Sequence, residues 1–165
     1  ESQLFFDPHY WLSPENVRII VNKMLNEFVD ILPQHKPYFV NNRNRFINKL
    51  DSLDKKISEV LNLKKNKILF VYHPAWGYFT DYYDIEQYSI EHEGKAPKAG
   101  DLKEILSSAK EKGVQCIFFD PHFDNSSVST IAEELKISID SLDPLPTDYL
   151  SNLVDIANKL ERYLR

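Results

Sequence analysis

The first third of the chain carries apolar residues at steps of three and four, which is the spacing of one face of an α-helix. Ser13-Pro14-Glu15 is a favourable helix start, because serine caps free amides, proline is tolerated in the first turn and glutamate suits the positive end of the helix dipole. The first apolar stripe continues until Pro33, and a second one spans residues 37–61. Together they predict a long helical hairpin, with a short coiled-coil seam as the alternative interpretation of the stripes.

From residue 67 onward the pattern changes to short apolar runs separated by helical segments. The runs are KILFVYH, VQCIFFD and ISIDSLD, and amphipathic stretches follow them at residues 101–113, 126–136 and 147–164. A further strand is expected near residues 86–90. Continuous apolar strands joined by helical crossovers are typical of a parallel sheet buried on both sides. We therefore expect an α/β fold, in which the hairpin precedes a Rossmann-like parallel sheet with helices on both faces.

Composition narrows the classes of partner. The 165 residues carry 20 basic and 25 acidic side chains, so a formal net charge of -5 offers nucleic acid no general attraction. No stretch approaches the roughly 18 apolar residues that a membrane-spanning helix needs. The single cysteine, Cys116, lies inside an apolar run, which predicts a buried and unreactive thiol. The chain starts at Glu1 without an initiator methionine, and we expect it to be a fragment or a processed product.

Polar side chains stand where the predicted strands end. His73 closes the first run, Asp120 and His122 follow the second, and Asp143 follows the third; His9 precedes the hairpin. Ligands of open parallel sheets bind beyond the carboxyl ends of the strands, so we expect these groups to share one edge. Imidazole nitrogen with carboxylate oxygen suits zinc or manganese. As a bare pattern the spacing is weak, because it contains no short metal-binding motif.

Four longer motifs give this pattern a context. They are DPHYWLSPENV at residues 7–17, FVYHPAWGYF at 70–79, IEHEGKAPKAGDLKEIL at 90–106 and LDPL at 142–145. In this order they resemble signature segments of the zinc/manganese-receptor family, the solute-binding subunits of metal ABC importers. The resemblance covers nearly the whole chain. It indicates the C-terminal half of such a receptor, including the helix between its lobes.

The resemblance implies a domain organisation. In that family two α/β lobes are joined by a long helix, and the metal lies between the lobes. Residues 1–13 would then be a remnant of the N-terminal lobe, and residues 14–62 the connector helix with the helix that follows it. Residues 63–165 would be the C-terminal metal-binding lobe. Most of the N-terminal lobe would be missing, and the surface it leaves bare would favour self-association.

The resemblance also implies a ligand set. His9 would be the ligand at the end of the N-terminal lobe, and His73 and Asp143 would be the ligands of the C-terminal lobe. A fourth ligand would come from the missing lobe, so the site in this chain should be incomplete. Manganese receptors of the family tend to carry a carboxylate where His73 stands. We therefore expect Zn²⁺ as the transported ion, with Mn²⁺ as the alternative.

Other polar residues have more than one interpretation. Asp120 and His122 stand where relatives more often carry a glutamate and a glutamine, and they would either support the metal ligands, form an auxiliary site or make a solvated loop pair. His35 and His92 lie in polar turns and are expected at the surface.

Aromatic residues are concentrated after His73. Trp76 and Tyr78, with their neighbours up to Tyr83, would either stack on a ligand or pack a short helix over the metal pocket. We favour packing, which would also shield the metal ligands from water.

The expected function is capture of a divalent metal outside the cytoplasmic membrane and its delivery to the permease of an ABC importer. The location would be the periplasm or the outer face of the cytoplasmic membrane, with or without an anchor. No catalysis is expected. Two alternatives remain. One is a zinc-dependent hydrolase, because three protein ligands and a water also describe catalytic zinc; the other is an adhesion or interaction domain on the same scaffold.

Overall fold

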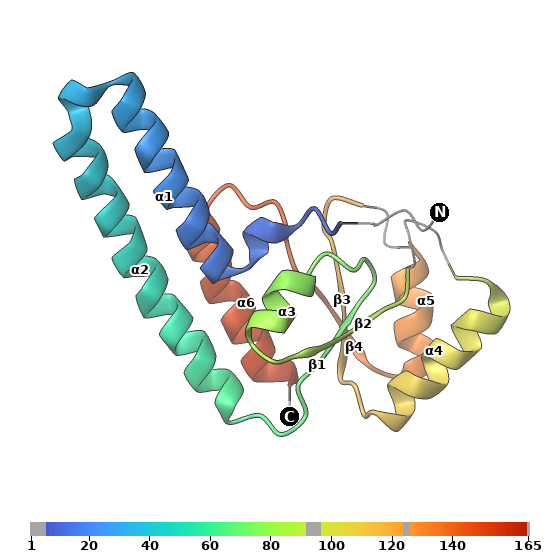
Figure 1. The fold of residues 1–165 in the computed structure, drawn as a ribbon. Coiled ribbons are helices and arrows are strands. Elements are labelled where there is room, and N and C mark those ends of the chain that lie inside the picture. Colours follow the sequence, from blue (N-terminus) through green and yellow to red (C-terminus); the bar gives the residue numbers. More distant parts are fainter. Residues whose placement is uncertain (1–5, 92–96, 124–125, 165) are drawn as a thin grey trace.

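The computed structural model describes residues 6–91, 97–123 and 126–164. They form a parallel sheet with helices on both faces and a helical hairpin that extends away from it (Figure 1). The helices are η1 (Tyr10–Leu12), α1 (Pro14–Ile31), η2 (Pro33–His35), α2 (Lys36–Asn62), α3 (Gly77–Tyr82), α4 (Ala99–Glu111), α5 (Ser126–Leu135) and α6 (Tyr149–Tyr163). The strands are β1 (Ile68–Val71), β2 (Glu86–Ser89), β3 (Cys116–Phe119) and β4 (Ser138–Ser141).

The predicted hairpin is confirmed. Helix α1 begins at Pro14. The backbone carbonyl of Ser13 accepts the amide of Val17, but the side chain of Ser13 makes no capping hydrogen bond. Helix α1 ends at Ile31 because Pro33, two residues later, cannot continue the helical hydrogen bonding. Within the described residues, no helix combines the length and the apolarity that crossing a bilayer requires.

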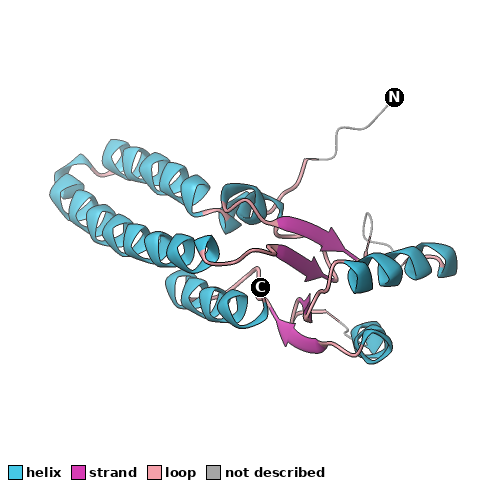
Figure 2. Cartoon of the chain, turned by 90° about the horizontal axis from the view of Figure 1, so that it is seen from below, coloured by secondary structure: helices cyan, strands magenta, loops and turns pink. Residues whose placement is uncertain are grey.

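The sheet has the strand order β2-β1-β3-β4, and all of its strands are parallel. Alternate side chains enter two separate cores. Leu69 and Phe118 pack on the side of the hairpin, α3 and α6, whereas Phe70 and Ile117 pack on the side of α4 and α5. Figure 2 shows the helices on either side of the strands. The expected α/β class with helices on both faces is confirmed.

A buried acid ties the hairpin to α3. Asp54 of α2 is only 8% exposed, and one of its carboxylate oxygens lies 2.5 Å from an Nη atom of Arg18 in α1. The hydroxyls of Tyr82 and Tyr83 donate to the same carboxylate at 2.8 and 2.7 Å. Burial and the bond to Asp54 raise the pKa of Tyr83, so its hydroxyl stays a donor at all ordinary pH values. Asp54 therefore fixes α1, α2 and the end of α3 to one another.

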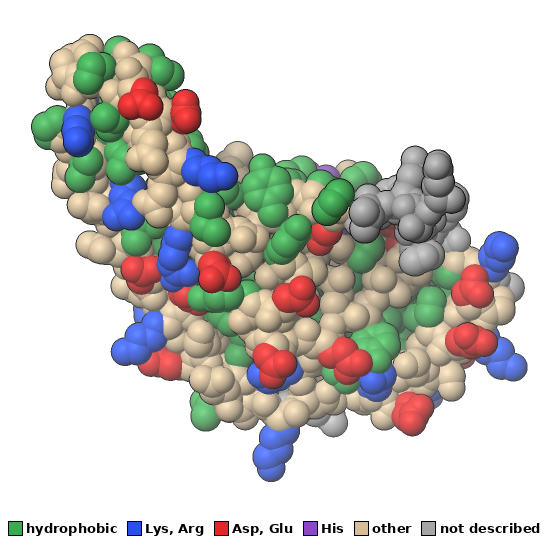
Figure 3. Space-filling view, in the orientation of Figure 1, with side chains coloured by type: hydrophobic (Ala, Val, Ile, Leu, Met, Phe, Trp, Pro, Cys, Tyr) green, Lys and Arg blue, Asp and Glu red, His purple; other side chains and the backbone are tan. Residues whose placement is uncertain are grey.

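The outer half of the hairpin stands apart from both cores. None of residues 18–49 is buried. Large apolar side chains are exposed there, with Ile31 at 70% and Tyr38 at 65%. Figure 3 shows hydrophobic side chains on the surface of the hairpin tip, in the part that projects beyond the sheet. The base of the hairpin is anchored differently, since Val17, Leu50, Ile57 and Leu61 are buried in the core.

Cys116 lies at the start of β3 and is buried, as the sequence predicts. Burial raises the pKa of its thiol to about 12, because the charged thiolate loses its hydration. The thiolate is the reactive form, so we expect the folded chain to resist alkylation by iodoacetamide at pH 8 and to react once unfolded in denaturant. Mass spectrometry of both samples measures this; rapid alkylation of the folded chain would contradict the buried thiol.

Candidate metal centre

His9 lies in the short segment before α1 and contacts Asp7 through both its backbone and its ring. Its backbone amide donates to Oδ1 of Asp7 at 2.9 Å, and its ring Nδ1 lies 2.7 Å from the same oxygen. Two residues later, the indole of Trp11 donates to the carbonyl of Pro144 at 2.8 Å, which ties the segment to the loop after β4. The ring of His9 thus has a fixed orientation, with Nδ1 on a carboxylate and Nε2 on the opposite side.

His73 follows β1 and has a similar arrangement. Its Nδ1 lies 3.3 Å from Oε1 of Glu91, which follows the neighbouring strand β2. The amide of Glu91 donates to the carbonyl of Tyr72 at 2.9 Å, so the parallel pairing of β1 and β2 places the carboxylate beside the imidazole. Again the carboxylate occupies Nδ1 and leaves Nε2 on the other side of the ring.

The two imidazoles lie together, although 64 positions separate them in the sequence. Their ring centroids are 5.4 Å apart and their planes are 79° from parallel. Two imidazoles that bind one tetrahedral zinc at about 2.0–2.1 Å have centroids about 5 Å apart. Metal-binding histidines commonly donate their second ring N–H to a carboxylate, and Asp7 and Glu91 stand in that position. The pair fits a first-row divalent ion.

Asp143 follows β4 and faces a different partner. Its Oδ1 lies 2.9 Å from Nε2 of His122 and accepts the amide of Leu145 at 2.8 Å. Across the described ranges, no three His, Cys, Asp or Glu side chains form a group that could hold a metal. The structure therefore brings His9 and His73 together and leaves Asp143 paired with His122, and the full ligand set stays a prediction.

Asp120 is not the solvated residue that one interpretation of the sequence supposed. It is only 8% exposed, and its Oδ1 accepts the backbone amide of His122 at 2.9 Å, which explains its burial at the turn after β3. His122 is exposed and contacts Asp143 through its ring. His35 is at the surface, as expected, and His92 lies outside the described residues.

The aromatic residues after His73 pack as a short helix, as the sequence predicts. Trp76 is 3% exposed in the core, and its backbone amide donates to the side chain of Gln87 at 3.0 Å. Phe79 and Tyr83 are buried with it. Tyr78 differs, because it is 36% exposed and lies beside α1.

Gly77, the first residue of α3, leaves room for Asp7. A Cβ atom placed on Gly77 would lie 2.8 Å from Oδ2 of Asp7, closer than real side chains approach. Sequence reasoning missed both Asp7 and Glu91. The signals were present: Asp7 opens the same motif as His9, and Glu91 follows a strand that had been predicted, at the edge where ligands bind.

Gly77→Ala is expected to weaken zinc binding about tenfold and to leave the fold intact. The new methyl group displaces the Asp7 carboxylate, and His9 then loses the support of its Nδ1; loss of such a supporting group typically costs 10- to 100-fold in metal affinity. Gly100→Ala is the matched control, because a Cβ there meets no atom within 4 Å. Calorimetric titration with zinc and thermal unfolding compare the two variants; equal zinc affinities would contradict the role of Asp7.

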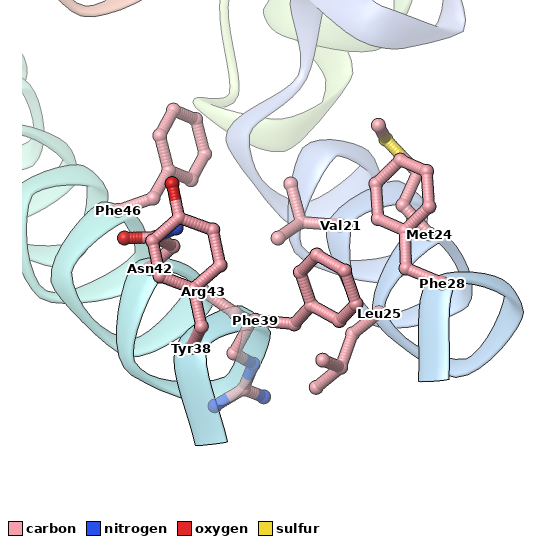
Figure 4. Close-up of a pocket in the computed structure, with 9 residues that line it drawn as sticks. All are labelled: Val21, Met24, Leu25, Phe28, Tyr38, Phe39, Asn42, Arg43 and Phe46. Carbon is pink, nitrogen blue, oxygen red and sulfur yellow. The ribbon is translucent and has the colours of Figure 1, made fainter. Parts of the chain in front are cut away.

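Two cavities along the hairpin lie away from the histidines. One of about 340 Å³ is an open groove between α1 and α2, lined by side chains of both helices (Figure 4). Its lining is Val21, Met24, Leu25, Phe28, Tyr38, Phe39, Asn42, Arg43 and Phe46. A second, of about 640 Å³, lies on the outer side of α1 and is bordered by Tyr10 and Tyr78. Neither is lined by His9 or His73, and both mark apolar surface along the hairpin.

Comparison with known proteins decides the family. The family model described as "Zinc-uptake complex component A periplasmic" (ZnuA) matches residues 1–163. The chain belongs to the ZnuA family. The high-affinity zinc uptake system protein ZnuA of Brucella abortus is 28% identical over an alignment of 166 positions, which covers 94% of this chain and 49% of the relative.

Solved structures of the ZnuA family share the fold. A crystal structure of ZnuA superposes with a TM-score of 0.94 at 30% identity, covering 99% of this chain and 62% of the other. A zinc-bound deletion mutant of ZnuA gives a TM-score of 0.90 at 31% identity, covering 97% of this chain and 62% of the other. The family resemblance seen in the motifs is confirmed. The chain spans about half the length of the curated relatives, and the ZnuA family is one of metal-uptake components rather than enzymes.

Proposed function

We propose that this chain is the C-terminal half of an extracytoplasmic solute-binding protein that captures zinc and delivers it to the permease of an ABC importer. The observation that carries the proposal is the histidine pair. The ring centroids of His9 and His73 lie 5.4 Å apart, and each ring has its Nδ1 on a carboxylate and its Nε2 on the opposite side. Two prepared imidazoles suit zinc better than manganese, which prefers oxygen ligands.

The proposed ligands are His9, His73 and Asp143, with a fourth from the missing N-terminal lobe. Residues 1–13 would belong to that lobe, residues 14–62 would connect the lobes, and residues 63–165 would form the C-terminal lobe. The loop that carries Asp143 is tied to the segment that carries His9, since the indole of Trp11 donates to the carbonyl of Pro144. Zinc would then be bound where segments from both lobes meet.

The proposed mechanism is binding and release without chemistry. Because the imidazoles are already oriented, capture of the ion requires little reorganisation of the site. The ion is released when docking to the permease favours a second arrangement of the lobes. Hydrolysis would need a free base beside the metal. Asp120 and His122, the candidates that the sequence offered, are already hydrogen-bonded, because Asp120 accepts the amide of His122 and the ring of His122 contacts Asp143.

The missing lobe is also proposed to cover α1 and the hairpin tip. Met24, Phe28 and Ile31 lie on α1 with 47%, 45% and 70% of their surface exposed, although their spacing is that of a packed helix face. Exposed apolar surface of this extent is typical of an interface. Without the lobe, the same surface would make the chain self-associate, which sedimentation at increasing concentration measures.

The first test is a calorimetric titration of the metal-stripped chain with zinc and then with manganese. We expect one zinc per chain and weaker binding of manganese. The companion sample is the chain extended upstream by the missing lobe, which should bind zinc more tightly because it supplies the fourth ligand. Zinc binding by neither sample would contradict the proposed function, and preference for manganese would overturn the choice of metal.

A further inference from the structure

One turn of the chain contacts both ligands that the sheet contributes to the proposed site. The turn is Asp120-Pro121-His122-Phe123, directly after β3. The ring of Phe123 lies against that of His73, with centroids 6.1 Å apart. The ring of His122 reaches across to the neighbouring strand end, where its Nε2 lies 2.9 Å from Oδ1 of Asp143.

The backbone of this turn is held by hydrogen bonds to Asp120. The buried carboxylate of Asp120 accepts the amide of His122, and the amide of Phe123 donates to the carbonyl of Asp120 at 3.3 Å. These two bonds hold the Cα atom of His122 in place even though its side chain is about half exposed. The direction in which the imidazole points is therefore set by the fold as well as by its partner.

The carboxylate of Asp143 is held by one oxygen. Oδ1 contacts the ring of His122 and accepts the amide of Leu145, and within the described ranges Oδ2 has no hydrogen-bond partner. Its backbone carbonyl accepts from Asn152 at 2.8 Å, which fixes the main chain at the same point. A carboxylate held in this way offers its second oxygen to an ion as a single ligand, while the first oxygen stays hydrogen-bonded.

We propose that His122 is a positioning residue that orients Asp143 toward the histidine pair, so that zinc meets a carboxylate already turned to it. The inference rests on the proposed function and gives a role to His122, at one of the two positions of this turn where relatives more often carry a glutamate or a glutamine. His122 itself does not bind the ion. Its ring keeps Oδ1 occupied, and Phe123 of the same turn lies beside His73, so one turn contacts both ligands of the sheet.

The test compares His122→Ala and His122→Gln with the parent, in whichever of the two samples above binds zinc more tightly. The glutamine amide can donate to Asp143 in place of the imidazole. We expect alanine to weaken zinc binding about tenfold, and glutamine to restore most of the loss. The absorption spectrum of bound cobalt should be the same in the parent and in His122→Gln, because no ligand has changed, and thermal unfolding of the metal-free variants should stay close to that of the parent.

Three results would overturn the inference. Unchanged zinc affinity in His122→Ala would show that His122 has no role in zinc binding. A shifted cobalt spectrum in His122→Gln, with no recovery of affinity, would make it a ligand. A large fall in the unfolding temperature of both metal-free variants would make its role structural. A parent that binds no zinc would instead remove the proposed function, and the inference with it.

Discussion

Asp54→Ala is expected to lower the free energy of unfolding by about 3 kcal/mol, since it removes the carboxylate that accepts from Arg18, Tyr82 and Tyr83. Arg18 keeps its bond to Asp51. The side chain of Arg18 is 26% exposed and would keep part of its hydration, which limits the loss. The hydroxyl of Tyr83, however, is buried and would lose its acceptor, at a cost of about 1–3 kcal/mol. Urea unfolding followed by circular dichroism measures the sum.

Asp51→Ala is the matched control for this variant. Asp51 lies one turn earlier on the same helix and binds the same arginine, at 2.9 Å from Nε, but it is 52% exposed. Exposed ion pairs contribute roughly 0–1 kcal/mol, so we expect little change. Equal losses in the two variants would show that burial of Asp54 is not what makes the network strong, and no loss in either would show that the network does not hold α3 to the hairpin.

His73→Ala is expected to weaken zinc binding on the order of a hundredfold, at or beyond the upper end of what a supporting group contributes. The variant removes one of two imidazoles whose ring centroids, 5.4 Å apart, lie near the separation expected for two imidazoles on one zinc ion. The fold should not change, because the side chain of His73 is 28% exposed and lies after the end of β1. Calorimetric titration with zinc, paired with thermal unfolding of the metal-free protein, separates affinity from stability.

His35→Ala provides the comparison for loss of a histidine as such. His35 lies in η2 at the tip of the hairpin, is exposed and is absent from the histidine pair. Its replacement should leave zinc affinity and stoichiometry as they are. If His73→Ala bound zinc as tightly as His35→Ala, the ion would be held elsewhere in the chain and the ligand assignment would fail.

The fold could be predicted from the sequence where its signals are local. The apolar stripes ending at Pro33 and the short apolar runs after residue 66 predict the hairpin and the strands of a parallel sheet. The strand order depends on how the crossovers pass over the sheet, and no local pattern fixes it. Asp54 is a related case. It interrupts the apolar stripe of Leu50, Ile57 and Leu61, which hints at burial, but its partners lie 28 to 36 positions away.

The candidate site divides in the same way. His9, His73 and Asp143 could be named because motifs and strand ends mark them. Their carboxylate partners could not be paired with them, since the contact of His73 with Glu91 depends on the register of β1 with β2. The burial of Asp120 was also missed, because an acid in a polar turn resembles a solvated one until the amide it accepts from is known.

The absence of buried side chains from residues 18–49 has a consequence for local stability. Hydrogen-bonded turns that carry little tertiary packing open at a low free energy, well below that of global unfolding. Amide hydrogens near the tip of the hairpin should therefore exchange with deuterium much faster than those near Leu50 and Leu61, which the core holds. If exchange became slower at the tip alone, the residues affected would be those that another surface covers.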